Sequence, residues 1–399
     1  MNANRLVSMR SRVVAPAALA GLALGRCQTG AALDLPQYLQ RDHLGEMLAL
    51  VPASAAGPDD NPMIATFADI AAQLAAGDID RPSSVEDDDG MTPWIHASYS
   101  LAIADPIRTR ALTITRDLLG YDVTDVDQTL EAGMPPEMVT LFRGRFDEAA
   151  VAVAWEINGY KMLEVDGTPV ASLFEDAEID MESQISQIAL ARMNNAAFLP
   201  DGTLAYTASL ALMEQVIATA KGDADSLGER EDVAALLASL DEPLVSAIFF
   251  SGDAISAAEQ ISPRLTSEQA DEIATQIADP EPMPPVALGL VGVTAGGPTL
   301  IYEEGEEPLI ELPPATIVYR LLMAEPGTAE TAAEVVDARL NRMSSAVNGQ
   351  PYAELFGTWE ATAAADGSTL AIDLTPAEGR PISFWPQVLF ARDLLFLAW

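Results

Sequence analysis

Three Asp-Gly turns constrain the fold of this chain more than any other feature. They stand at Asp166-Gly167, Asp201-Gly202 and Asp366-Gly367, each between apolar segments. Asp-Gly in this setting is a strong hairpin signal, because a type I′ turn needs two residues with positive φ. The turns therefore predict antiparallel sheets built from hairpins. A doubly wound parallel sheet would need a helix between successive strands throughout.

Residues 139–208 show how the hairpins combine with helices. Asp147 fits the N-cap of a helix, and Asn158-Gly159 fits its end. The apolar residues at helical spacing, expected to face inward, are Ala150, Val151, Ala154 and Ile157. This stretch is therefore predicted to run strand, helix, hairpin and second hairpin.

The same order recurs in the second half of the chain. TIVYRLL predicts a strand and residues 328–343 a helix, and TWEATAA and STLAIDL flank Asp366-Gly367. Agreement in order and turn chemistry favours an internal duplication, although strand–helix–hairpin units are common enough for a chance match. The predicted fold class is α+β, with mainly antiparallel sheets made from these units and helices on one face of each sheet.

The length of 399 residues favours at least two domains. The proline-rich DPEPMPP at 279–285 is predicted as a stiff linker. It would separate a first α+β lobe at 42–278 from a second at 286–399. Within the first lobe, apolar spacing predicts one helix over 62–76.

Residues 1–32 have the pattern of an export signal. Arginines precede VVAPAALAGLALG, which is too short to span a bilayer. The sequence LALGRC, ending at Cys27, resembles a bacterial lipoprotein signal, in which the cysteine carries lipid. Arg26 departs from that pattern, so lipid attachment at Cys27 and ordinary cleavage near Ala31 or Ala32 both stay open. Either predicts a protein on the outer face of the bacterial membrane or outside the cell.

The acid excess limits the partners. The chain has 60 Asp and Glu against 21 Lys and Arg, a net charge of −39. Nucleic acid or an anionic membrane surface would be repelled. The sequence therefore predicts no nucleic-acid partner, and membrane contact only through an N-terminal lipid. A hydrophobic content of 49% excludes intrinsic disorder.

Recognisable catalytic chemistry is missing from the sequence. His43 and His96 lie far apart, neither at a metal-like spacing, and Cys27 is the single cysteine. There is no Gly-x-Ser-x-Gly elbow and no phosphate-binding loop. One acidic cluster has a spacing that fits no metal-ligand scheme: Asp122, Asp125, Asp127 and Glu131. We therefore predict no catalytic, cofactor-binding or metal-binding residues, and no cofactor.

Two blocks carry a family resemblance. PPEMVTLFRGRFD and the stretch from TLAYTAS to LVSAIFF are similar to uncharacterised exported bacterial proteins and lipoproteins whose domains have no assigned function. The resemblance implies no activity. We expect a non-enzymatic binding or scaffold protein of the cell envelope or exterior, whose ligand is a small or hydrophobic molecule or an envelope protein. The alternative is an exterior hydrolase with two carboxylates converging in a cleft, one of them with a raised pKa.

Overall fold

The computed structural model describes residues 42–56, 65–76, 78–99, 115–256, 282–295, 315–345, 349–378 and 394–399, with 271, 274, 275 and 277. All of these belong to the unit Pro36–Trp399. The predicted export signal, with Cys27, lies outside the described residues.

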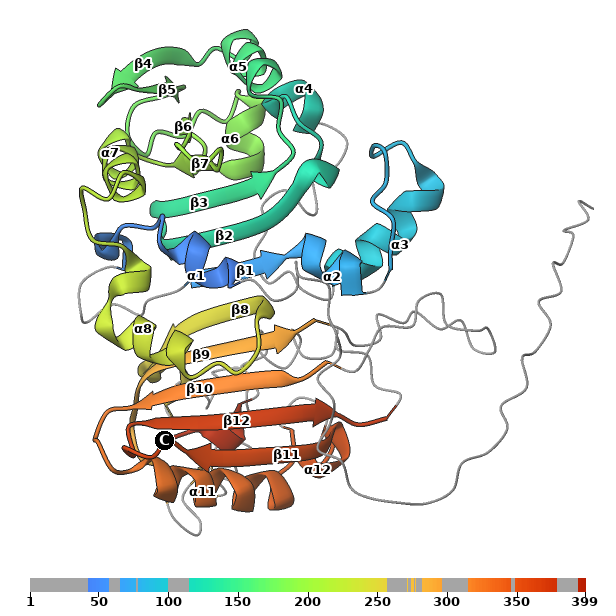
Figure 1. The fold of residues 1–399 in the computed structure, drawn as a ribbon, viewed down its shortest axis with the longest axis vertical. Helices are drawn as coiled ribbons and strands as arrows, with labels where there is room; N and C mark the ends of the chain where they lie inside the picture. The colour runs from blue at the N-terminus through green and yellow to red at the C-terminus, as the bar shows by residue number, and fades with distance from the viewer. Residues whose placement is uncertain are drawn as a thin grey trace, which may run out of the picture. The chain divides into compact units, whose positions relative to one another are not determined.

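Twelve strands of the described residues form one sheet, and every recorded pair is antiparallel (Figure 1). The order is β11-β12-β10-β9-β8-β1-β2-β3-β7-β6-β5-β4. The bounds are β1 Ala65–Asp69, β2 Val126–Met134, β3 Glu137–Gly144, β4 Lys161–Val165, β5 Thr168–Ser172, β6 Asn195–Phe198, β7 Leu204–Thr207, β8 Leu244–Ser251, β9 Val286–Thr294, β10 Ile317–Met323, β11 Phe356–Ala363 and β12 Thr369–Pro376. The α+β class and the antiparallel pairing are confirmed.

The predicted turns join the predicted hairpins. Asp166 and Gly167 have φ of 47° and 75° and connect β4 to β5. Gly202 and Gly367, also at positive φ, lie in the turns from β6 to β7 and from β11 to β12. Helix α5, Glu148–Ile157, begins after Asp147, whose side chain accepts hydrogen bonds from the amides two and three residues later. These local elements follow the chemistry of their own residues.

The sheet extends across the predicted boundary, because β8, before the predicted linker, pairs with β9, which follows it. At its centre β1 pairs with β8. Outward from β1 the order is β2, β3, β7, β6, β5, β4; outward from β8 it is β9, β10, β12, β11. Apart from the inserted β6–β7 hairpin the two orders match, and α5 and α11, Ala329–Arg342, occupy equivalent connections. The repeated unit is present, whereas separate lobes at 42–278 and 286–399 stay a prediction.

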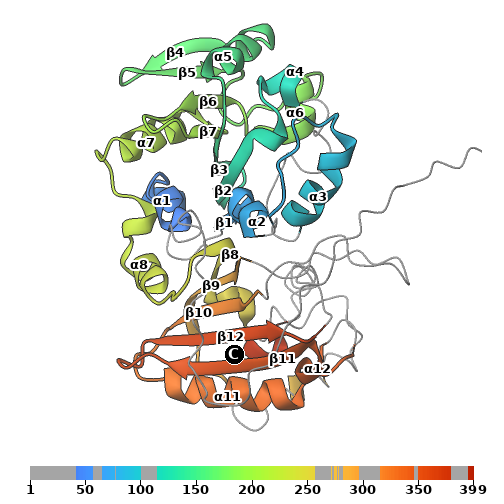
Figure 2. The same cartoon turned by 45° about the vertical axis from the view of Figure 1, so that its right-hand side comes forward.

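Helices lie on both faces of the sheet (Figure 2), whereas the sequence predicted helices on one face only. One face packs against α1 His43–Leu48, α7 Leu210–Ala220 and α8 Glu231–Ala238. The other packs against α2 Ile70–Ala76, α3 Asp88–Tyr99, α4 Thr115–Leu119, α5 and α6 Gln184–Ala189, and, towards β11, against α11 and α12 Tyr352–Leu355. Strands buried on both faces carry few polar residues to mark an outer side.

Burial on both faces also explains an error in the predicted elements. Residues 65–69 form β1, with all five residues buried, and only residues 70–76 form α2. Phe67, Ile70 and Leu74 are apolar at helical spacing, but they divide between a strand and a helix. The prediction of one helix over 62–76 was therefore wrong for β1.

The end of the chain packs into the core. Leu394, Leu395, Phe396 and Leu397 are buried in the cluster beneath α11. Arg339 of α11, itself buried, donates hydrogen bonds to the carbonyl oxygens of Ala398 and Ile277 at 2.5 Å each, and burial lowers its pKa to about 10. None of the described helices has the length and hydropathy needed to cross a bilayer.

Candidate functional site

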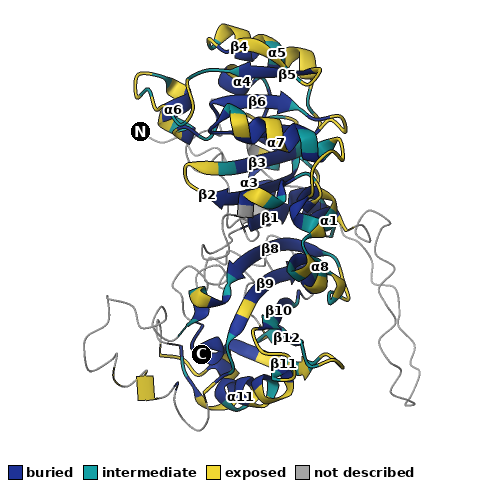
Figure 3. Ribbon diagram, turned by 90° about the vertical axis from the view of Figure 1, so that its left-hand side faces the viewer, coloured by how far each residue is buried: buried dark blue, intermediate teal, exposed yellow. Residues whose placement is uncertain are grey.

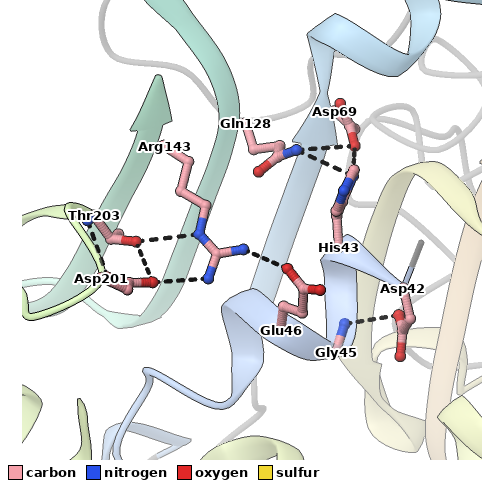
Figure 4. A network of polar contacts seen from close by, with 9 residues as sticks. All are labelled: Asp42, His43, Gly45, Glu46, Asp69, Gln128, Arg143, Asp201 and Thr203. Atoms are coloured by element: carbon pink, nitrogen blue, oxygen red, sulfur yellow. Dashed lines mark hydrogen bonds and ion pairs between the residues drawn. The ribbon is translucent and has the colours of Figure 1, made fainter. Parts of the chain in front are cut away.

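A row of polar side chains crosses neighbouring strands beneath α1 (Figure 4). Asp69 ends β1, Gln128 lies opposite it on β2, and Arg143 lies opposite Gln128 on β3. Directly opposite residues of antiparallel strands share a face. From above, α1 contributes His43 and Glu46, which are three residues apart and so lie on the same side of the helix.

The inner part of the row is buried. His43, Asp69 and Gln128 are 5%, 2% and 4% exposed. His43 Nδ1 lies 2.5 Å from Asp69 Oδ2, and since a carboxylate only accepts, Nδ1 donates. Gln128 Nε2 donates to the same oxygen at 3.3 Å. Asp69 Oδ1 accepts from the Ala72 amide at 2.8 Å, so this carboxylate also holds the first turn of α2.

The outer part of the row centres on Arg143. Its Nη1 donates to Glu46 Oε2 at 2.8 Å, its Nη2 to Asp201 Oδ2 at 2.9 Å and its Nε to Thr203 Oγ1 at 3.2 Å. Thr203 in turn donates to Asp201 through its amide and its hydroxyl. The guanidinium thereby ties α1 to the β6–β7 turn, and each of its nitrogens bonds to the protein.

These contacts favour a structural role for the row. A His–Asp pair is the orienting half of a nucleophile triad, but a catalytic base has to reach its substrate. His43 lies on the buried side of α1, Asp69 lies beneath that helix, and Arg143 is already bonded through all three nitrogens. Within the described ranges there is also no group of three or more His, Cys, Asp or Glu that could hold a metal ion.

The acidic cluster singled out in the sequence is divided among arginines. Each acid pairs with its own partner: Asp122 with Arg116, Asp125 with Arg145, Asp127 with Arg81, and Glu131 with Arg192. Burial raises the pKa of Glu131, and Arg192, 3.0 Å away, opposes the rise. Burial likewise raises the pKa of Asp122 and of Asp127, against their arginines. The cluster forms ion pairs and not a shared centre.

Three of the surface hollows in the described part of the chain bear on the search for a site, and the two larger ones have a mainly polar lining. One of about 780 Å³ lies between α11 and the β11–β12 turn, with Glu330, Glu334 and Asp337 on its helical wall. A second, of about 740 Å³, lies between the start of α1 and the end of α7, and a third, of about 150 Å³, beside Arg320. The described carboxyls with a raised pKa, Asp122, Asp127 and Glu131, line none of the three.

Exposed apolar side chains gather in one part of the sequence. All large ones among the described residues come from residues 134–190: Met134, Val153, Ile157, Met162, Leu163, Ile179, Met181 and Leu190. Four of them lie on α5 and on the edge strand β4, which contact each other (Figure 3). We call the exposed part of these two elements, with Val153, Ile157, Met162 and Leu163, the α5–β4 surface; Met162 and Leu163 are adjacent and point to opposite faces of the edge strand.

Sequence reasoning missed this surface. Ile157 was expected to face inward, but it is 77% exposed. The buried residues of α5 are Val151, Ala154 and Trp155. Helical spacing predicts that such an apolar residue is buried. Which apolar stripe of α5 is in fact covered depends on how the helix packs on the sheet.

The structure also joins residues that the sequence did not pair. His43 meets Asp69 and Gln128, which are 26 and 85 residues away along the chain. No local pattern signals that contact. The side chain of His96 and the lipid-attachment candidate Cys27 lie outside the described residues. Comparison of the chain with protein-family models, curated proteins and solved structures found no match.

Proposed function

We propose that this protein is an exported, non-enzymatic binding or scaffold protein that docks a partner protein on the α5–β4 surface. One observation supports this above all. Every large exposed apolar side chain of the described residues lies within 134–190, and half of them belong to this surface. Apolar side chains scattered singly over a surface are ordinary, whereas a gathered patch marks an interaction site.

The charge near the surface favours a protein partner. Glu148, Glu156 and Glu164 are exposed on the same two elements. With a net charge of −39, the chain repels nucleic acid and anionic bilayers. A small molecule would need a concave site, and the hollows described above are lined by other elements. A protein that presents apolar and basic side chains fits both features.

Export and an outer location rest on the N-terminal sequence pattern. Intact mass of the protein recovered from its own cells tests them. We expect a chain that begins at Cys27 with an added lipid mass, or one that begins near Ala31 or Ala32 without it. Recovery of the uncleaved Met1 form from the cytoplasm would contradict export. It would not test the docking surface, which the next experiment addresses.

Site-specific cross-linking tests the docking role. A photoreactive amino acid at Ile157 or Met162 should cross-link to a discrete partner in intact cells, whereas the same amino acid at Thr358, exposed on the opposite edge strand β11, should not. Ile157→Glu should remove the Met162 cross-link. Equal cross-linking from all three positions refutes a specific surface. Turnover of a glycan or peptide panel, lost when one carboxylate is replaced, would favour the hydrolase instead.

A further inference from the structure

We infer that the partner contributes an extended segment of alternating apolar and basic residues, which adds to the sheet as a strand beside β4. This inference rests on the proposed docking role of the α5–β4 surface. It specifies how the partner binds and what its chemistry is.

The first observation is the open edge. β4 is the last strand in the sheet order, and among the described strands it pairs with β5 alone. Its first four residues are exposed. An exposed edge offers a row of unpaired amides and carbonyls, and an extended peptide can satisfy them by main-chain hydrogen bonds.

The hairpin register shows which groups face outward. In a two-residue hairpin the residues flanking the turn, here Val165 and Thr168, exchange hydrogen bonds with each other. The alternation of an antiparallel ladder then directs the amide and carbonyl of Glu164 and of Met162 away from β5. Pro169 lies opposite Glu164. A residue without an amide hydrogen fits that non-bonded position.

The opposite edge of the sheet is less suited to pairing. β11 has a register shift between Phe356 and Thr358, and it carries none of the large exposed apolar side chains found among the described residues. Bulges of this kind interrupt the edge against added strands. The two edges of one sheet therefore differ, and β4 is the one with apolar side chains at the open ladder.

The side chains define the occupant. Met162 lies opposite Ala171, which packs in the same cluster as Val151 and Trp155 of α5, so Met162 lies on the α5 side of the sheet. A strand added beside β4 would place every second side chain on that side, where Met162 and Glu164 both lie because they are two residues apart. Basic side chains on the α5 side would meet Glu164, and their aliphatic stems would cover Met162. The alternate, apolar side chains would contact Leu163 on the opposite face of β4.

A second copy of this chain fits less well. In a two-fold antiparallel pairing of β4 with itself, residues on the same face lie opposite each other. Glu164 would then lie opposite Met162, opposite Glu164 or opposite Tyr160 of the other copy, and none of these is basic. Each protomer also carries the same negative net charge, so the two copies would repel each other. We therefore assign the position to a cationic segment of a different protein.

A peptide titration of the full chain tests the inference. The probe is a labelled seven-residue peptide of alternating valine and lysine, followed by fluorescence anisotropy, with a valine–glutamate peptide as control. We expect only the lysine peptide to bind, and more weakly at high salt. Met162→Pro, which removes one outward amide, should weaken binding at least about tenfold, because main-chain bonds supply the affinity. Met162→Ala, which keeps that amide, should weaken it by only about threefold.

Amide hydrogen exchange of the unaltered protein gives a readout that needs no substitution. With bound peptide, the amides of Met162 and Glu164 should exchange more slowly, whereas the Leu163 amide, bonded to β5, should not change. Equal binding by Met162→Pro and the parent, or unchanged exchange at residues 162 and 164, overturns strand addition.

Failure of the strand model is separable from failure of the docking role. Cross-links from Ile157 that persist despite Met162→Pro would keep the surface and exclude the strand. A concentration-dependent dimer that Met162→Pro dissolves would assign β4 to a second copy and also overturn the inference.

Discussion

Replacing Asp69 with alanine tests how strongly the buried row holds α1, β1 and β2 together. Asp69 accepts three hydrogen bonds: from His43 Nδ1 at 2.5 Å, from Gln128 Nε2 at 3.3 Å and from the Ala72 amide at 2.8 Å. The side chains of His43, Asp69 and Gln128 are each at least 95% buried, so water cannot simply replace the lost acceptor. We expect Asp69→Ala to be the most damaging substitution in this row.

The magnitude follows from these contacts. Loss of the acceptor for the first turn of α2 costs about 1 kcal/mol. Each buried donor left without this carboxylate costs about 1–3 kcal/mol, and part of the sum is offset because alanine avoids desolvating a charge. The net loss expected for Asp69→Ala is about 4 kcal/mol.

Asp69→Asn is the matched control. Its Oδ1 still accepts from the Ala72 amide, and its amide group can donate to His43 once the imidazole adopts the other tautomer. We expect less than half of the loss seen with alanine.

Urea unfolding, followed by tryptophan fluorescence and far-ultraviolet circular dichroism, measures both changes. At a slope of about 3 kcal/mol per M, a loss of 4 kcal/mol lowers the midpoint by about 1.3 M. A shift below about 0.3 M at an unchanged slope would show that the row contributes little to stability. Equal losses for alanine and asparagine would show that the hydrogen bonds are not the cause.

Two further substitutions give separate tests. Burial raises the pKa of Glu131 above its usual 4.5 despite Arg192, so the folded state holds this proton more tightly. The stability that this proton contributes is fully present below pH 4.5 and is lost as pH rises through the raised pKa. Glu131→Gln, which has no such proton to lose, should therefore gain in urea midpoint relative to the parent between pH 4 and 7. A difference between the two midpoints that does not change with pH contradicts this. In Gly252→Ala the added Cβ would lie 1.5 Å from the Val286 carbonyl oxygen, so a loss of at least about 3 kcal/mol is expected in thermal unfolding. The loss for Gly357→Ala, whose nearest atom is 3.3 Å away, should be clearly smaller.

The sequence predicted the elements whose signals are local. Asp166-Gly167 requires a tight turn with positive φ, and Asp147 caps the helix that follows it, whatever the rest of the chain does. The repeat of strand, helix and hairpin could be predicted from the sequence for the same reason. Each of its parts is determined by residues within a few positions of one another.

The sequence could not rank apolar residues by burial. β1 lies between β2 and β8, is buried on both faces, and was predicted as part of a helix because its apolar residues also satisfy helical spacing. Ile157 fits the same spacing on α5 and yet faces solvent. Hydrophobicity alone does not specify which side of an element another element will cover.

Only the tertiary structure joined the two halves and placed the candidate sites. The pairing of β1 with β8 makes one sheet from two similar units, and it depends on residues about 180 positions apart. The same holds for the contact of His43 with Asp69 and for the position of β4 at the edge of the sheet. Turns and caps depend on nearby residues, whereas an edge, a buried polar row and an exposed apolar surface depend on which distant segments pack together and which are left uncovered.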